Sequence, residues 1–336
     1  MPYDQVQFLG HAINTGPARD PTNNTYAYVG RSNVDDDIRD RIARVRSLLQ
    51  VARDEAAPDA GILKVMMLPE FYFRGPRGAY TLDQALRVVE GLQALVQDEQ
   101  WRDWFFAFGS VIAYSYAGDV DPMDDNTEPA EVYNIVPCQI GGYGQDAADA
   151  ARVVMKEKLS GIDFISSPTS PDGLRGAQDY EAFLLDYVSH LDPMSDIGVD
   201  SEVQFVNYGG EGVFKACGFT WGVEVCLDHA LGRLQQSSNL PKIAFQLIPS
   251  CGMSIKGANI ALQTGWVFNV DGLNRGRTSS AAAPGPAHTE LLEVVAGNTQ
   301  SLDPVRVALA TLDVAGLYAH GAGELHVYPP QPAIPS

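Results

Sequence analysis

Three side chains that could catalyse a reaction each stand at the end of an apolar stretch. "LKVMMLPE" ends at Glu70, "RVVMK" ends at Lys156 and "TWGVEVC" ends at Cys226. A cysteine becomes a nucleophile when a base removes its proton, and a carboxyl group in apolar surroundings is suited to accept and return protons. The set therefore indicates thiol chemistry, with Cys226 as a candidate nucleophile that needs a base, usually a carboxylate or a histidine.

Each of these residues also has a plain structural interpretation. Free cysteine is among the most buried residue types, so Cys226 taken alone would be a core thiol. Glu70 taken alone would face solvent in a turn, and Lys156 would be a surface residue at a strand end. The position of Cys226 favours the catalytic interpretation, because the polar Asp228 and His229 stop the buried strand there. Proteins of the α/β class place their sites at the carboxyl ends of strands.

Strand-like and helix-like stretches alternate along the chain, which indicates a layered α/β fold with helices covering sheets. A helix at 37–56 is indicated by apolar residues that recur every three or four positions, such as Val45, Leu48, Leu49 and Ala52. The other expected helices are 82–101 and 228–238. The expected strands are 3–13, 61–70, 104–116, 132–140, 151–159, 242–250, 264–273 and two strands within 212–226.

The segment 160–201 interrupts this alternation. It begins with a loop rich in Pro, Gly and Ser and continues with the amphipathic "YEAFLLDYVSHL". A loop of this length in a compact domain is usually functional or disordered, and we interpret it as an insertion or a lid. With no internal repeat or linker visible, we expect one domain over 1–320. The Pro-rich segment 321–336 is expected to form a tail over the surface or toward a partner.

The composition excludes several classes of protein. The 336 residues are 45% hydrophobic and 19% charged, which is typical of a globular protein with a sizeable core. The net charge of -19, from 42 acidic and 23 basic residues, opposes binding to nucleic acid or to an anionic membrane. No stretch is apolar and long enough for a membrane helix, and "MPYDQVQFLG" lacks the features of a signal peptide. A cytoplasmic protein is therefore expected.

The cysteines predict neither disulfides nor a structural metal site. Cys138, Cys217, Cys226 and Cys251 show no C-x-x-C spacing and are too few for a disulfide framework in a chain of this size. We expect reduced thiols and no bound metal.

The ordered set Glu70, Lys156 and Cys226 resembles the nitrilase superfamily of carbon–nitrogen hydrolases. "LPEFYFRG" is similar to the Pro-Glu strand end of that family, and "GFTWGVEVCLDH" to its Gly-x-x-Gly-x-x-x-Cys-x-Asp element. "VYNIVPCQIGG" and "KIAFQLIPSCG" resemble its Tyr-Asn and Pro-Ser strands. The resemblance covers residues 5–315 apart from the insertion. It implies a four-layer α-β-β-α sandwich that assembles as a homodimer or a higher homo-oligomer.

The resemblance also implies a role for each site residue. Glu70 would be the base and Cys226 the nucleophile, while Lys156 and the backbone N–H of Leu227 would hold the oxyanion. Strand alternation places Lys156 and Lys158 on one face, so geometry alone leaves both open, and the family pattern favours Lys156. A second glutamate that orients the lysine or the leaving group is assigned to Glu202. The nearby alternatives are Glu211 and Glu224. No metal or organic cofactor is implied.

The substrate implied by the resemblance is a small amide or N-carbamoyl compound, because family members with these activities more often carry the Asp that this chain has at position 228. The alternatives are nitrile hydrolysis, acyl transfer to an amine, and a non-catalytic binding protein on the same scaffold. Two departures weaken inference about the substrate: 160–201 lengthens the spacing between Lys156 and Cys226, and "HALGRL" replaces the family's Arg-Phe-Pro-Glu. The candidates for substrate binding are Phe71, Tyr72, Asp228, His229 and Cys251.

Overall fold

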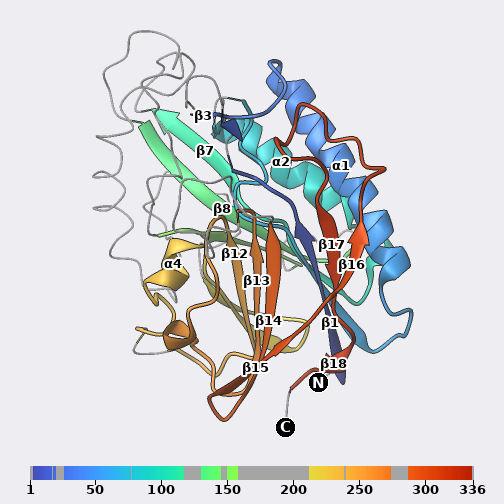
Figure 1. Ribbon diagram of the computed structural model, residues 1–336, viewed down its shortest axis with the longest axis vertical. Helices are drawn as coiled ribbons and strands as arrows, with labels where there is room; N and C mark the ends of the chain where they lie inside the picture. The colour runs from blue at the N-terminus through green and yellow to red at the C-terminus, as the bar shows by residue number, and fades with distance from the viewer. Residues whose placement is uncertain are drawn as a thin grey trace.

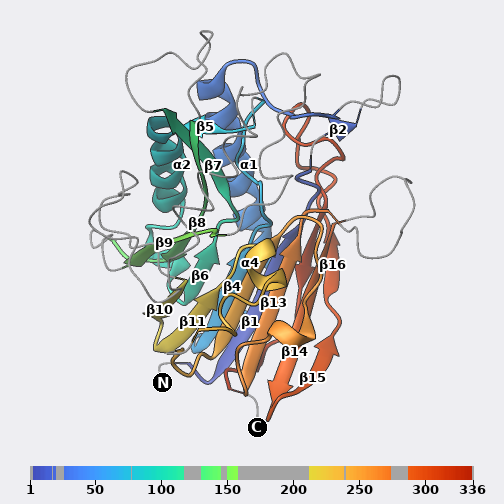
Figure 2. The same ribbon diagram turned by 90° about the vertical axis from the view of Figure 1, so that its left-hand side faces the viewer.

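The computed structural model describes residues 3–16, 18–19, 26–76, 78–116, 130–144, 150–157, 212–237, 240–273 and 287–334. Within these ranges, two large β-sheets pack face to face and two long helices cover the outer face of one of them (Figures 1 and 2). The expected layered α/β sandwich is confirmed. The expected insertion at 160–201, together with Lys158, Glu202 and Glu211, lies outside the described residues.

The larger sheet contains ten strands. Its main path runs β16 (Val305–Ala308), β17 (Glu324–Val327), β1 (Gln5–Ala12), β4 (Ile62–Met67), β6 (Trp104–Ala107), β8 (Ala130–Ile140), β7 (Val111–Tyr116) and β5 (Tyr80–Thr81), with β18 (Gln331–Pro332) beside β1 and β9 (Ala151–Met155) beside β8. Strands β1, β4 and β6 are parallel, so their carboxyl ends lie at one edge.

The smaller sheet contains six strands in chain order: β10 (Val213–Ala216), β11 (Phe219–Val223), β12 (Phe245–Ser250), β13 (Gly265–Asp271), β14 (His288–Val295) and β15 (Asn298–Leu302). Strands β11, β12 and β13 are parallel, and the flanking pairs are antiparallel. A separate short ribbon pairs β2 (Ala18–Arg19) with β3 (Tyr26–Ala27).

The expected tail at 321–336 is corrected by the structure. Strand β17 pairs antiparallel with β1, with Leu9 opposite Val327, and β18 pairs with the start of β1, with Val6 opposite Gln331. The Ala333 N–H also donates to a carbonyl near the start of β1. The prolines misled the prediction, because proline is tolerated on an edge strand and between strands.

The helix layer consists of α1 (Val34–Glu55) and α2 (Leu82–Leu95), followed by the short turn η1 (Glu99–Trp101). The Asn33 side chain caps α1, and Thr81 with Gln84 forms a capping box at the start of α2. The apolar faces of both helices pack against the ten-stranded sheet. None of the helices in the described ranges is long and apolar enough to cross a membrane.

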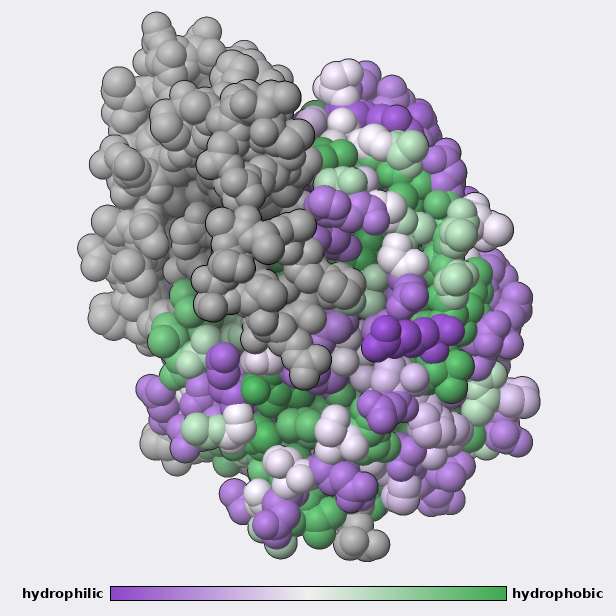
Figure 3. All heavy atoms as spheres, in the orientation of Figure 1, coloured by the Kyte–Doolittle hydropathy of each residue, from purple (hydrophilic) through white to green (hydrophobic). Residues whose placement is uncertain are grey.

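The outer face of the six-stranded sheet carries a thinner layer, formed by α4 (Leu227–Ala230) and η3 (Gly257–Asn259), and Figure 2 shows α4 in front of the sheet. The helix expected at 228–238 is shorter than predicted, because Gly232 adopts a φ of 72° that ends the helical path. In Figure 3, hydrophobic residues lie among polar ones in the lower part of the face over β12–β14.

The strand expected at 104–116 is two strands in the structure, β6 and β7. Gly109 lies between them with a φ of 70°, and a Cβ at this position would collide with the carbonyl oxygen of Pro69. The break therefore lets the chain pass close to the segment that carries Glu70.

Two hydrophobic cores result from the alternation of side chains along the strands. In β4, Leu63, Val65 and Met67 face the six-stranded sheet, whereas Met66 faces the helices. The inter-sheet core contains an aromatic stack in which Trp221 lies 4.2 Å from Phe105 and 4.4 Å from Phe245, measured between ring centroids. This packed interior fixes the strand ends from which the candidate site is built.

Candidate active site

Glu70 is fully buried just beyond the end of β4. Its backbone N–H donates to the carbonyl of Ser250 at 3.3 Å, and its carbonyl accepts a hydrogen bond from the Thr15 hydroxyl at 2.6 Å. The next residue, Phe71, has a φ of 61° and donates its N–H to the Ser110 hydroxyl at 2.8 Å. The chain therefore turns sharply after Glu70 and is held on both sides of the turn.

Lys156 follows the last residue of β9 and forms a buried ion pair with Glu70. Its Nζ lies 2.9 Å from Glu70 Oε1, and both side chains have no exposed surface. The side-chain amide of Asn134 in β8 donates to the same oxygen at 2.9 Å, and the Asn134 backbone carbonyl accepts the Lys156 backbone N–H at 2.8 Å. A buried ion pair requires close geometry and further hydrogen bonds to offset the loss of hydration, and Asn134 supplies one of them.

Cys226 lies at a strained turn between β11 and α4. Its φ of 48° and ψ of −102° are unusual for a residue with a side chain. Such conformations cost about 1–3 kcal/mol and cluster at functional sites. A nucleophile on a sharp strand-to-helix turn is held forward of the sheet, as in the nucleophile elbow of other hydrolases. Cys226 is 7% exposed, so it is buried but not completely enclosed.

Strand β12 connects the Cys226 turn to the Glu70 turn, although the two belong to different sheets. The Cys226 N–H donates to the Pro249 carbonyl at 3.1 Å, and the Glu70 N–H donates to the carbonyl of the next residue, Ser250. Ser250 is itself held by Asn269, which donates to its hydroxyl at 2.8 Å. The nucleophile and base candidates are therefore anchored to adjacent peptide groups.

A second link connects the Cys226 turn with the strand that carries Lys156. The Asp228 carboxylate accepts the backbone N–H of Glu157 at 3.0 Å, and Arg233 donates its Nε–H to the Glu157 carboxylate. All three side chains are buried. Together with the Lys156–Glu70 pair and the β12 contacts, this link closes a ring of interactions around the three candidates.

Three residues of this ring had no role predicted from the sequence: Asn134, Glu157 and Arg233. Asn134 is the residue for which the sequence carried a signal, because an amide inside the apolar stretch "VYNIVPCQI" must be buried and hydrogen-bonded. Glu157 and Arg233 carried none, since their pairing depends on how β9 approaches the turn after Cys226.

Two of the predicted substrate-binding residues lie beside the ion pair. The Phe71 ring centroid is 5.9 Å from Lys156 Nζ. Cys251 is buried, and the Thr15 hydroxyl that bonds Glu70 is also 3.8 Å from its Sγ. Desolvation, together with the charges of Asp271 and Glu70, raises the pKa of the Cys251 thiol far above its usual range. This thiol stays protonated, in keeping with a role other than that of nucleophile.

Tyr72 makes its contacts within the protein interior. Its hydroxyl donates to His11 Nδ1 at 3.1 Å, and its carbonyl accepts hydrogen bonds from Arg41 and Tyr318 at 3.0 and 3.1 Å. Burial raises its pKa well above the usual value. These contacts favour a role in fixing the turn after Glu70 over the expected role in binding substrate.

His229 is fully buried, and both of its ring nitrogens are bonded inside the protein. Nε2 accepts the Lys256 backbone N–H at 3.0 Å, so Nδ1 carries the proton and donates to Glu224 at 2.9 Å. Glu224 also accepts hydrogen bonds from Leu234 and Gln246. This network holds α4 against β12, which favours a structural role for His229 and for Glu224. Substrate binding by Asp228 and His229 remains a prediction.

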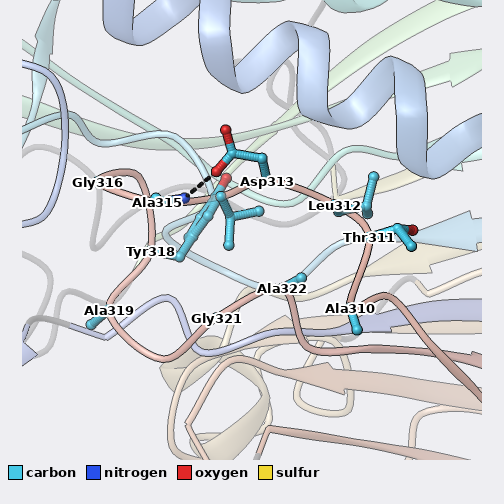
Figure 4. Close-up of a pocket in the computed structure, with 11 residues that line it drawn as sticks. Ala310, Thr311, Leu312, Asp313, Ala315, Gly316, Tyr318, Ala319, Gly321 and Ala322 are labelled. Atoms are coloured by element: carbon cyan, nitrogen blue, oxygen red, sulfur yellow. Dashed lines mark hydrogen bonds between the residues drawn. The ribbon is translucent and has the colours of Figure 1, made fainter.

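Two adjoining hollows lie in the described part of the structure, and one of them reaches residues beside Glu70. The wider one is formed by residues 310–322, where the Asp313 side chain accepts the Ala315 N–H, and none of the three catalytic candidates lines it (Figure 4). The narrower one shares Tyr318 and Ala319 with it and is lined on the other side by Thr15 and Phe71. In the described ranges, no group of three or more His, Cys, Asp or Glu residues is arranged to hold a metal ion.

Neither a protein-family model nor a curated protein sequence matches the chain. Among solved structures, the chain is similar to Nit3 of Saccharomyces cerevisiae, a member of branch 10 of the nitrilase superfamily, with 14% identity and a TM-score of 0.46 over 97% of this chain and 89% of Nit3. It is similar to an amidase from Nesterenkonia sp., with 12% identity and a TM-score of 0.44 over 98% and 91% of the two chains. A carbon–nitrogen hydrolase from Helicobacter pylori is 10% identical, with a TM-score of 0.43 over 89% and 85%.

Proposed function

We propose that this protein is a carbon–nitrogen hydrolase of the nitrilase type that cleaves a small amide or N-carbamoyl compound through a thioester on Cys226. The observation that carries the proposal is the buried Lys156–Glu70 pair, which is tied through β12 and Asp228 to the strained Cys226 turn. A carboxylate, an ammonium group and a thiol are the groups that acyl transfer requires.

In the first half-reaction, Glu70 accepts the proton of the Cys226 thiol, and the sulfur attacks the substrate carbonyl carbon. The C–S bond forms as the carbonyl electron pair moves to the oxygen. When that pair returns, the C–N bond breaks and Glu70 passes its proton to the departing nitrogen. Ammonia or an amine leaves, and the acyl group remains on sulfur.

In the second half-reaction, the same carboxylate accepts a proton from water, and the water oxygen attacks the thioester carbon. The C–S bond breaks, the acid is released, and the proton held by Glu70 returns to the sulfur. The Asn134 and Lys156 hydrogen bonds to Glu70 Oε1 hold the carboxylate in one orientation through both steps.

The negative oxygen that forms in each half-reaction requires hydrogen-bond donors. We assign this role to the Lys156 ammonium and the Leu227 backbone N–H, which directly follows the nucleophile. Removing one such donor from a preorganised site typically costs about 3–4 kcal/mol of transition-state stabilisation. Glu202 is proposed to orient Lys156 or the leaving group.

Asp228 favours an amide or N-carbamoyl substrate over a nitrile, as the sequence resemblance implies. Its contact with the Glu157 N–H adds a physical role, because it couples the nucleophile turn to the lysine strand. Nitrile hydrolysis and acyl transfer to an amine use the same thioester, so a substrate panel separates them.

The test uses purified protein, a panel of amides, N-carbamoyl amino acids and nitriles, and intact-protein mass spectrometry. We expect turnover of amides or N-carbamoyl compounds, an acyl adduct on Cys226, and loss of both in Cys226→Ala. The matched control is Cys138→Ala, which removes another buried thiol from the inter-sheet core and should retain turnover and the adduct. Turnover by Cys226→Ala at the wild-type rate would falsify the proposal.

A further inference from the structure

The turn that carries Glu70 has a strained backbone. Phe71, the next residue, has a φ of 61°, which is unusual for a bulky side chain. Such a conformation persists only where the surrounding structure fixes it. The Ser110 hydroxyl accepts the Phe71 N–H at 2.8 Å, and the Ser110 carbonyl accepts the Phe73 N–H at 3.0 Å. A further contact is made by the carbonyl of Tyr72, two residues after Glu70.

The Tyr72 carbonyl binds two donors that come from distant parts of the chain. Arg41 of α1 donates its Nη1–H at 3.0 Å, and the Tyr318 hydroxyl donates at 3.1 Å. Tyr318 belongs to the loop 310–322 that lines the wider hollow (Figure 4). Burial raises the pKa of Tyr318 to about 12, so the hydroxyl keeps the proton that it donates. The Arg41 guanidinium also lies 4.8 Å from the Tyr318 ring centroid, so the two donors fix each other.

The Arg41 guanidinium is itself held on several sides. Its Nε–H donates to the Asp37 carboxylate at 2.8 Å, and Nη2 donates to the carbonyls of Val29 and Leu317 at 2.7 and 3.1 Å. Asp37 in turn accepts the Tyr80 hydroxyl at 2.6 Å. The Arg41 and Asp37 side chains are both buried. Arg41 is therefore a rigid donor that joins the turn after the base to α1 and to two other segments of the chain.

We propose that Arg41 and Tyr318 are positioning residues, which orient the general base by holding the Tyr72 carbonyl. With the turn fixed, the Glu70 carboxylate keeps the orientation in which Lys156 binds it. Displacing a reacting group by about 1 Å can lower a rate by about a hundredfold, so these two donors control the rate from outside the reaction centre. This inference rests on the proposed function and adds the residues that position its base.

Tyr318→Phe tests the inference with the smallest change, because it removes one hydroxyl and keeps the ring. The matched control is Tyr328→Phe, which removes another buried tyrosine hydroxyl, hydrogen-bonded to Thr289 at 2.8 Å. We expect kcat to fall about tenfold in Tyr318→Phe with KM nearly unchanged, and both constants to stay at wild-type values in Tyr328→Phe.

Arg41→Lys gives a second variant that keeps the positive charge beside Asp37. It should lower kcat further than Tyr318→Phe does, because lysine has three N–H donors where Arg41 uses four. If Arg41→Lys fails to fold, Tyr318→Phe still decides the question. Arg46→Gln, at an exposed arginine of the same helix, should leave kcat unchanged.

A second readout needs no substrate and separates positioning from a general loosening of the fold. The rate at which iodoacetamide alkylates Cys226 at pH 7 is followed by peptide mass spectrometry. We expect Tyr318→Phe to slow this rate by about fivefold, and Glu70→Gln to slow it further, because the base is displaced in the first and absent in the second. In a Glu70→Gln background, Tyr318→Phe should have no further effect, whereas a purely structural role would still change the rate.

The inference would be overturned if Tyr318→Phe matched Tyr328→Phe in both kcat and Cys226 alkylation. An effect of Tyr318→Phe that persisted in full without the Glu70 carboxylate would overturn it as well. If the wild-type protein turns over no amide, N-carbamoyl compound or nitrile while Tyr318→Phe slows alkylation through Glu70, the proposed hydrolysis fails and the positioning role stands. If substrates are turned over and Tyr318→Phe changes neither readout, the reaction stands and the positioning role fails.

Discussion

Strands β11 and β12 contribute to two different regions of the molecule. Along their length they place aromatic side chains in the inter-sheet core, and at their carboxyl ends they place polar groups at the candidate site. Along the strands, Trp221 and Phe245 stack on each other and on Phe105 of the opposite sheet. At the ends, Cys226 and Ser250 enter a ring of directional hydrogen bonds. The same strands thus contain one region stabilised by apolar packing and another region stabilised by hydrogen bonds.

This difference predicts how a substitution in each region should affect stability and rate. Apolar packing is non-directional, so its loss costs stability in proportion to the volume removed. A buried polar ring behaves otherwise, because removing one member leaves its partner desolvated and misplaced. We therefore expect substitutions at the polar end to affect both rate and stability, and substitutions in the aromatic region to affect stability alone.

Of the substitutions considered, replacing Lys156 with Met should have the largest effect, because it should lower both the rate and the stability. It removes a proposed oxyanion donor, so kcat should fall by about 10²–10³-fold. It also leaves the Glu70 carboxylate buried without its cation, which should lower the free energy of unfolding by about 3–5 kcal/mol. Steady-state kinetics and urea denaturation measure the two effects.

The matched control for this prediction is Lys158→Met, which removes the same charge two residues along the chain. It should retain most of the turnover. The reverse result would move the lysine role to position 158. In a double variant, Glu70→Gln with Lys156→Met should recover part of the lost stability without recovering activity, because no unpaired charge remains buried.

Replacing Trp221 with Ala should cost a similar amount of stability and leave the rate nearly unchanged. The side chain is fully buried against two stacked rings, so we expect a loss of about 3–5 kcal/mol in the free energy of unfolding. The kcat of the folded fraction should stay within a few fold of wild type, and Trp221→Phe should cost less stability because most of the stack is kept. If Trp221→Ala lowered kcat as much as Lys156→Met does, the division between the two regions would be wrong.

Much of this arrangement could be predicted from the sequence, because hydrophobic periodicity reports which face of an element is buried. The apolar stripe of α1 and the continuous buried stretch of β4 were both visible in this way. The strand ends at Glu70, Lys156 and Cys226 followed from the points where each apolar stretch stops. The pairing of Lys156 with Glu70 brings two of those three predicted positions together.

The sequence could not predict the contacts between elements that are distant in the chain. The Glu157–Arg233 pair and the Pro249 and Ser250 carbonyls depend on how two sheets pack, which no local pattern encodes. The backbone conformation at two positions could not be predicted from the sequence for a similar reason. The positive φ at Cys226 and the break at Gly109 are fixed by tertiary contacts rather than by local preference.

The polar end should also carry a pH dependence that the aromatic region lacks, and His11 is the residue that tests it. At the end of β1, its Nε2–H donates to the Ala322 carbonyl at 2.8 Å and its Nδ1 accepts the Tyr72 hydroxyl. Burial lowers the pKa of His11 from 6.5 to about 4. The folded protein therefore keeps the ring neutral, while the unfolded chain takes up a proton as the pH falls through 6.5.

A depressed pKa in the folded state gives stability that is fully present above the unfolded value and is lost as the pH falls toward the folded value. We expect this residue to cost roughly 3 kcal/mol of unfolding free energy between pH 7 and pH 4. Urea denaturation across this range should show a shallower decline in His11→Gln than in wild type, because glutamine cannot titrate. His320→Gln, at an exposed histidine, should follow the wild-type curve. Parallel curves for His11→Gln and wild type would mean that the turn after Glu70 tolerates a charged imidazole, and the polar end would then be less tightly specified than its hydrogen bonds indicate.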